Sequence, residues 1–360
     1  MLNICISFDY ELYMGKNDCS LNEILIDPTN EILEMLDKYN VKATFFADVC
    51  CPVFFEKNMM EKDFTHSMRE QLRDMQRRKQ DVQLHIHPHW LKTEYNEAER
   101  SLSFDKKYYR IHSYGFDNGS NSVQDIIKKS VAYLEDVLLP IDNGYKCIAY
   151  RAGGFAVQPE EELTKVLLEN GIRIDSSVAE KCEYPGTNMR YDFSFCDSKH
   201  NFFFNAEKGF RKRYREKEED RLLEVPIATC SIPLIKYLIV KKNPSGFAHY
   251  SRGSYMNISD EKQKKQNALS RRINALFKDA TILSLDHLCG DALYDLAELY
   301  KKTSKAKNND VYISVLGHPK LFNHDKIKSM ETFIKKVQTN KDMRFVTMRE
   351  IYDEVFECKG

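Results

Sequence analysis

Apolar and polar residues alternate at the start of the chain, and this period of two predicts a β-strand with two unlike faces. The apolar face consists of Leu2, Ile4, Ile6 and Phe8. Ser7, Asp9 and Glu11 form the other face. Because residues i and i+2 of a strand point to the same side, we expect the two carboxylates to face the same way.

The rest of the chain alternates between short apolar runs and longer stretches with helical periodicity. The predicted strands are 41–47, 82–86, 147–150, 172–175, 222–225, 281–285, 312–316 and 344–347. The predicted helices are 29–40, 67–79, 123–138, 159–170, 261–277, 292–302, 324–338 and 348–356. Repeated strand–helix units with short connections predict an α/β fold with parallel strands, as a barrel or an open sheet. In both architectures the active groups gather at the C-terminal ends of the strands.

Three stretches, 92–121, 183–221 and 236–260, interrupt this order and are rich in aromatic and charged residues. We interpret them as loops over the strand ends that shape a substrate site, although surface decoration would explain any one of them equally well. No internal repeat, low-complexity tract or domain linker divides the chain. Residues 1–360 are therefore expected to form a single catalytic domain.

The composition is that of a globular protein, with 42% hydrophobic residues and equal numbers of basic and acidic residues, 54 each. The zero net charge and the absence of a recognition motif argue against a nucleic-acid partner. The ten cysteines are scattered, which favours a reducing compartment. No apolar run is long enough to span a bilayer, and the first residues do not form a signal peptide, so we expect a cytoplasmic protein.

Histidines cluster at the end of the predicted strand 82–86, where His85, His87 and His89 lie within five residues. In an extended chain His85 and His89 would be about 13 Å apart, too far to share a metal ion. Pro88 favours a bend that could bring them together, whereas His87 and His89 could share a metal ion without one. The spacing does not decide between these pairs, but it indicates a metal or acid–base site.

Other ionisable residues follow predicted strands further along the chain. Arg151 is a candidate cation for the carboxylates of Asp9 and Glu11, which would otherwise be costly to bury. His318 ends a strand near the C-terminus, and Asp286 follows another strand and is a further candidate to reach the site. A base, an acid, a metal ion and an arginine together form the inventory of a hydrolase.

The order of these motifs resembles that of the polysaccharide deacetylases, the family 4 carbohydrate esterases. The order is a strand ending in Asp, then H-x-x-x-H, then R-x-x-x-F, and a late L-x-H. Supporting stretches are Ala43-Thr44-Phe45-Phe46, Asp175-Ser176-Ser177 and Glu224-Val225-Pro226. The resemblance covers residues 4 to about 352 and implies an irregular (β/α) barrel with about seven parallel strands.

The resemblance also implies a role for each motif residue. Asp9 resembles the catalytic base, and Arg151 resembles the arginine that holds the base carboxylate. His85 and His89 resemble the two metal histidines. His318 resembles the general acid that protonates the departing amine. A backbone N–H near residues 153–155 would help to stabilise the oxyanion.

The sequence departs from the family pattern at two points. Where the family has two adjacent aspartates, the second a metal ligand, Tyr10 follows Asp9, so we assign the ligand role to Glu11, two positions on. The family's R-x-P-aromatic turn is replaced by Arg-Ala-Gly-Gly-Phe at 151–155, whose glycines allow a close backbone approach or a positive φ. A set of two histidines and one carboxylate with an open position makes zinc the default metal, with manganese, iron, cobalt or nickel as alternatives.

The function implied is a metal-dependent hydrolase that removes an N-acetyl group from a sugar or from the precursor of a cell-surface glycan. Two alternatives stay open. The same site could cleave a non-sugar amide such as a cyclic ureide or imide, or the chain could be a glycan-binding relative without catalytic activity.

Overall fold

The structure is a computed structural model that describes residues 1–117, 119–196, 200–230, 252–256, 281–304 and 310–357. Its α-helices are α1 (Asp27–Lys38), α2 (Cys50–Asn58), α3 (Lys62–Arg77), α4 (Val123–Leu138), α5 (Glu160–Glu169), α8 (Gly290–Thr303), α9 (His324–Gln338) and α10 (Met348–Tyr352). The strands of its main sheet are β1 (Leu2–Tyr10), β2 (Thr44–Asp48), β3 (Asp81–Ile86), β6 (Ala149–Ala152), β7 (Ile174–Asp175), β10 (Phe202–Asn205), β11 (Arg221–Glu224), β14 (Val311–Gly317) and β15 (Met343–Phe345). Short two-stranded sheets are formed by β4 (Thr93–Asn96) with β5 (Ser101–Phe104), β8 (Glu183–Pro185) with β9 (Arg190–Asp192), and β12 (Thr229–Cys230) with β13 (Thr281–Ile282).

The main sheet is curled, and nearly all of its strands are parallel. Its order is β10-β11-β7-β6-β3-β2-β1-β14, with β15 also paired to β1, and β10 alone among these is antiparallel to its neighbour. Single bridges join Ile227, which follows β11, to Ala179 on one side and to Ser314 of β14 on the other. These bridges complete a ring of seven parallel strands, so the predicted α/β class and barrel are confirmed.

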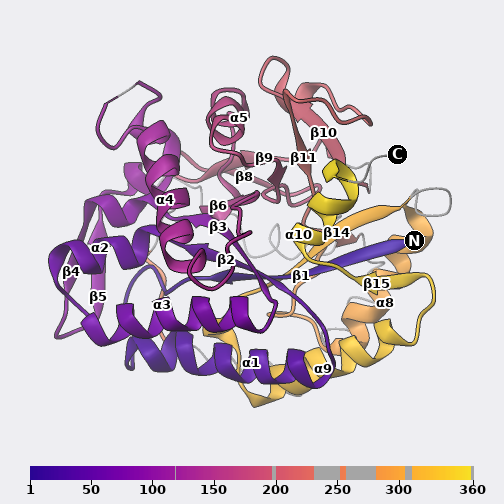
Figure 1. The fold of residues 1–360 in the computed structure, drawn as a ribbon, viewed down its shortest axis with the longest axis horizontal. Coiled ribbons are helices and arrows are strands. Elements are labelled where there is room, and N and C mark those ends of the chain that lie inside the picture. Colours follow the sequence, from indigo (N-terminus) through magenta and orange to yellow (C-terminus); the bar gives the residue numbers. More distant parts are fainter. Residues whose placement is uncertain (118, 197–199, 231–251, 257–280, 305–309, 358–360) are drawn as a thin grey trace, which may run out of the picture.

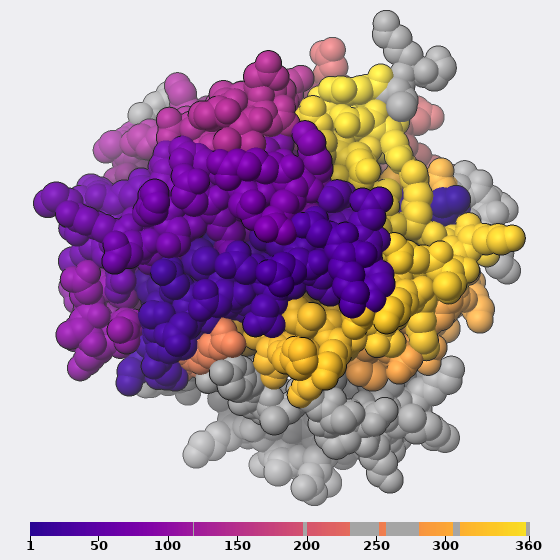
Figure 2. Space-filling view, turned by 60° about the horizontal axis from the view of Figure 1, so that its bottom comes forward, coloured from indigo at the N-terminus to yellow at the C-terminus, as the bar shows by residue number. Residues whose placement is uncertain are grey.

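Helices cover the outside of the sheet (Figure 1). The N-terminal helix α1 packs beside α9, and the early and late parts of the chain share one face of the molecule (Figure 2). Side-chain caps fix the starts of several helices: Ser122 accepts from the backbone of α4, Asn323 from that of α9, and Thr347 forms a capping box with Glu350 at α10. In the described residues no helix is both long and apolar enough to cross a membrane.

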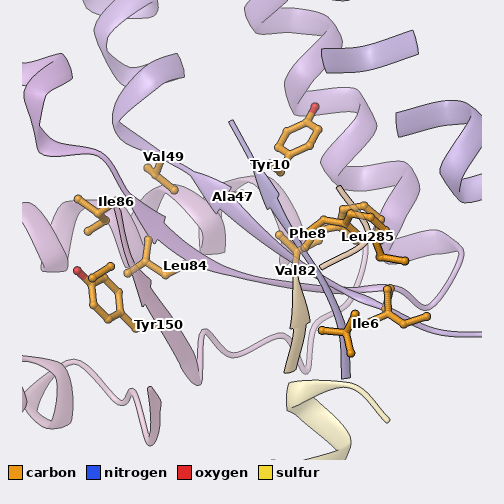
Figure 3. Close-up of a cluster of buried hydrophobic side chains, with 14 of the residues drawn as sticks. Ile6, Phe8, Tyr10, Ala47, Val49, Val82, Leu84, Ile86, Tyr150 and Leu285 are labelled. Carbon is orange, nitrogen blue, oxygen red and sulfur yellow. The ribbon is translucent and has the colours of Figure 1, made fainter. Parts of the chain in front are cut away.

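The two predicted faces of β1 point in opposite directions. Its apolar side chains join others from β2, β3 and β6 in the buried cluster of Figure 3. There Phe8 stacks on Phe45, with ring centroids 5.1 Å apart. On the other face Ser7 lies 2.7 Å from Ser314, oxygen to oxygen, inside the ring of strands. Asp9 shares that inner face.

Most predicted elements agree with the structure to within a few residues, and α4 and α9 match their predicted bounds. Helix α2 was not predicted, because its residues lack a clear helical period and its second residue is followed by Pro52. The loop stretches 92–121 and 183–221 contain the hairpins β4–β5 and β8–β9. The predicted helix 261–277, and the stretch 236–260 apart from residues 252–256, lie outside the described residues. That residues 1–360 form one catalytic domain stays a prediction.

Candidate metal centre

The predicted site residues of β1, β3, β6 and β14 meet at the C-terminal ends of these strands. Asp9 and Glu11 come from the end of β1 and the residue beyond it, Arg151 from β6, and His318 from just after β14. Asp9 and Glu11 are 4% and 5% exposed, and Arg151 is fully buried. At this burial an unpaired charge would be strongly destabilising, so each needs a partner.

Glu11 lies against two histidines. Its Oε2 is 3.1 Å from Nε2 of His85 and also contacts Nε2 of His87. One ligand atom from each of these residues lies within 4.8 Å of the others. His85 and His87 face the same way because they are two positions apart at the end of a strand.

The hydrogen bonds of His85 suit a metal ligand. Its Nδ1 lies 2.8 Å from the carbonyl oxygen of Arg151, which can only accept, so Nδ1 carries a proton. In the neutral ring Nε2 therefore has a lone pair facing the Glu11 oxygen, and either a proton on Nε2 or a metal ion between the two atoms relieves that contact. Burial lowers the pKa of His85, but the charges of Asp9 and Glu11 raise it to about 9 overall. The donor set therefore fits a metal ion.

His89 is not part of this cluster. The chain turns after His87 into a 3₁₀ helix, Pro88–Lys92, and the ring of His89 stacks on Phe104 with centroids 4.3 Å apart. Neither ring nitrogen of His89 has a hydrogen-bond partner among the described residues. Burial and the neighbouring His87 lower the pKa of His89 well below its ordinary value.

The two histidines that lie together beside Glu11 in the structure are therefore His85 and His87. This pair differs from both pairs considered from the sequence, which each included His89. His85 and His87 share the strand face of Glu11, whereas Pro88 turns His89 away from it. Asp48 holds this turn, since its carboxylate accepts from the backbone N–H of His87 at 3.1 Å and from the indole N–H of Trp90 at 2.9 Å. The bend expected at Pro88 is present, but it does not return His89 to His85.

Asp9 is paired with Arg151 inside the barrel. Arg151 donates from Nη1 to Oδ1 of Asp9 at 2.6 Å, from Nε to the Ser176 carbonyl at 2.8 Å, and from Nη2 to the hydroxyls of Ser176 and Ser314. Its guanidinium lies 4.1 Å from the centroid of the Phe46 ring. Burial raises the pKa of Asp9, but the charges of Arg151 and the nearby histidines outweigh it and lower the pKa.

His318 is held by a carboxylate and faces the two acidic residues of β1. Asp286 accepts from the His318 backbone N–H at 2.9 Å and lies 2.7 Å from its Nδ1. Nε2 of His318 then lies 3.7 Å from both Asp9 and Glu11. Burial lowers the pKa of His318, but the charge and hydrogen bond of Asp286, together with the charges of Asp9 and Glu11, outweigh burial and raise it. The candidate Asp286 therefore reaches the site through His318.

Lys320 is a site residue that the sequence analysis missed. Its side chain is fully buried, and its ammonium donates to Oε1 of Glu11 at 2.6 Å and to the Leu12 carbonyl at 3.0 Å. Lys320 lies in the 3₁₀ helix Pro319–Leu321 that follows His318, and no local pattern in the sequence signals its burial.

Both glycines of the 153–154 turn are required by close contacts. A Cβ on Gly153 would lie 2.6 Å from the Ile86 carbonyl oxygen and 2.7 Å from Nδ1 of His87. Gly154 has a φ of +58°, and a Cβ there would lie 2.0 Å from the Tyr109 hydroxyl. The departure from the family's proline turn therefore makes room for His87 and Tyr109 beside the cluster.

No protein-family model matches this sequence, and no curated protein does. Similar solved structures include two proteins described as polysaccharide deacetylases. The one from Mycobacterium smegmatis has a TM-score of 0.48 and 13% identity, and the match covers 98% of this chain and 90% of that one. The one from Pseudomonas aeruginosa PAO1 has a TM-score of 0.46, 11% identity and coverages of 99% and 92%. The Puue allantoinase has a TM-score of 0.47, 9% identity and coverages of 99% and 91%.

Proposed function

We propose that this protein is a metal-dependent hydrolase that removes an N-acetyl group from a sugar or a glycan precursor. The observation that carries the proposal is the buried cluster of Glu11, His85 and His87. It lies within reach of one carboxylate, Asp9, and one carboxylate-held imidazole, His318. The choice of an N-acetyl sugar as substrate rests on the sequence resemblance.

Glu11, His85 and His87 would hold the metal ion and leave positions open for water and substrate. We propose zinc, with manganese, iron, cobalt or nickel as alternatives. Once bound, the ion would polarise the amide carbonyl and activate a water molecule. In this arrangement His87 takes the ligand place that the resemblance gave to His89.

The proton transfers are assigned to residues on either side of this cluster. Asp9 accepts the proton of the attacking water, and Arg151 keeps its carboxylate ionised and oriented. His318 donates a proton to the departing amine from Nε2, because Asp286 holds Nδ1 and favours the protonated ring. The backbone around 153–155 would supply a donor for the oxyanion, as the resemblance implies.

The test compares the metal content of wild type, His87→Ala and His89→Ala by elemental mass spectrometry, after confirming that each variant is folded. We expect near-stoichiometric metal in wild type and in His89→Ala, and its loss in His87→Ala. His89→Ala is the matched control, because it removes the same side chain from an equally buried position. Loss in His89→Ala alone would return the ligand role to His89, and no metal in wild type after reconstitution would refute a metallohydrolase.

Activity assays on the same protein preparations test which reaction the protein catalyses. Metal-loaded wild type is expected to release acetate from one or more members of a panel of N-acetyl sugars. Asp9→Asn should retain the metal and lose about 10²–10⁴-fold in rate, the usual contribution of a general base. Activity that survives Asp9→Asn would refute the assigned base. Ring opening or ammonia release from a cyclic ureide would favour the alternative amide substrate, and ligand binding without turnover would favour a non-catalytic relative.

A further inference from the structure

Lys320 is unusual among the lysines because its charged group is buried against the proposed metal ligand. Its side chain is fully buried, and the ammonium lies 5.3 Å and 5.0 Å from the ring centroids of Tyr13 and Tyr255. The Tyr13 hydroxyl donates to the Lys320 carbonyl at 3.0 Å, which fixes the backbone as well. Fully buried lysines are rare unless they are paired, and here the partner is Glu11.

The two oxygens of Glu11 face different groups. Oε2 faces the nitrogens of His85 and His87, whereas Oε1 is 2.6 Å from the Lys320 ammonium and 3.7 Å from His318. With Oε1 held in this way, one oxygen of the carboxylate is directed toward a metal ion. A carboxylate with both oxygens free can also bind a cation through both.

Two carboxylates of the site already face a fixed cation before any metal ion binds. Asp9 pairs with Arg151, and Glu11 pairs with Lys320. A divalent cation held by neutral histidines therefore enters a site with a positive ammonium on the far side of its carboxylate ligand. Like charges repel strongly at the low effective dielectric constant of a protein interior, so the ammonium opposes binding.

We propose that Lys320 is a positioning residue of this site, which keeps Oε1 of Glu11 away from the metal ion and weakens the affinity of the site for divalent cations. The inference rests on the proposed function, since it assumes that Glu11, His85 and His87 bind a metal ion. It assigns to Lys320 a role in setting the coordination number and the affinity.

The experiment measures cobalt(II) binding to wild type, Lys320→Met and Lys320→Gln by calorimetry and by visible absorption. Both variants remove the ammonium and should bind cobalt more tightly, by about tenfold or more. In Lys320→Met both Glu11 oxygens become available, so the visible bands of bound cobalt should weaken as the coordination number rises. If Lys320→Met does not fold, the cobalt affinity of Lys320→Gln tests the effect of the ammonium charge.

Lys301→Met is the matched control. Lys301 is also largely buried and ion-paired, with Glu298 at 2.9 Å, but it lies on α8. Its loss should leave cobalt affinity and absorption unchanged. A purely structural Lys320 would give less stable variants with wild-type cobalt affinity and spectrum, which would overturn the proposal. Tighter binding with an unaltered spectrum would support the charge effect and overturn the positioning of Oε1. Failure of wild type to bind cobalt would instead refute the proposed function.

Discussion

Two groups of buried carboxyls lie at the same end of the barrel, and they differ in charge. The first group stays ionised beside cations, whereas the second group becomes neutral. In the first group Asp9 and Glu11 each face a fixed cation, Arg151 or Lys320, and their pKa values are lowered. In the second group Asp175 and Glu224, opposite each other on β7 and β11, are both fully buried.

The second group has no ion-pair partner among the described residues. Asp175 accepts from the Ser177 hydroxyl at 2.6 Å and Glu224 from the Val178 backbone at 3.1 Å. Burial raises the pKa of Asp175 to about 6, and burial together with Asp175 raises that of Glu224 well above its ordinary value. Burial therefore favours the protonated, neutral form of both carboxyls.

The comparison shows which buried carboxyls could bind a metal ion. A carboxylate needs to stay ionised to bind a cation or to accept a proton from water. Arg151 and the nearby histidines keep Asp9 ionised, and His87 and Lys320 keep Glu11 ionised before any metal ion binds. The second group becomes neutral instead and links two strands of the barrel. The same residue types therefore act as chemical groups in one place and as structural groups in the other, because their neighbours differ in charge.

The largest effect is expected from removing the cation of the first group. Arg151→Met leaves Asp9 buried and unpaired and should lower the free energy of unfolding by about 3–5 kcal/mol, measured by urea denaturation. Arg211→Met is the control, because Arg211 is 75% exposed in its 2.8 Å pair with Glu161. That change should cost about 1 kcal/mol or less. Equal losses in both variants would contradict the comparison.

Asp286 tests a third way of keeping a buried carboxylate ionised, with a histidine as the cation. Burial raises the pKa of Asp286, but the charge of His318 and its side-chain and backbone hydrogen bonds together outweigh burial and lower it, whereas Asp286 raises the pKa of His318. The pair is fully charged between the ordinary pKa values of 3.8 and 6.5, and its stabilisation is lost as pH rises through the raised pKa of His318 or falls through the lowered pKa of Asp286.

Asp286→Asn should therefore cost about 1.5–3 kcal/mol within that window and less at alkaline pH. The titration of His318, followed by NMR in the same metal state as wild type, should move to lower pH. A cost that is the same at all pH values, with an unmoved His318 titration, would show that the imidazole is not the cation that keeps Asp286 charged.

The contrast between the two groups also shows what the sequence could predict. Alternation in β1 placed Asp9 and Glu11 on one inner face, and strand ends predicted that Arg151 and His318 would join them. These predictions needed only the period of a strand and the rule that sites gather at the C-terminal ends of parallel strands.

The remaining features depend on contacts across the fold. His87 rather than His89 lies beside Glu11 because Asp48, far away in sequence, holds the turn that begins at Pro88. Lys320 reaches Glu11 across 309 positions, and no local pattern indicates that a lysine after a strand will be buried. The raised pKa values of the second group depend equally on which strands become neighbours.

Glu224→Gln is expected to have the smallest effect, since it fixes only the side chain at position 224 in a neutral form. The raised pKa values mean that the folded protein holds protons that the unfolded chain releases, so wild-type stability falls as pH rises from about 4 through the folded pKa of about 6 and beyond. The variant should lack the part of this fall that Glu224 causes, which amounts to about 1.4 kcal/mol per pH unit for one proton. Urea denaturation at pH 5, 6 and 7 measures the difference, with Glu162→Gln, at an exposed position of α5, as the control. Parallel pH dependences for wild type and Glu224→Gln would mean that both carboxyls are ionised and that the two groups do not differ.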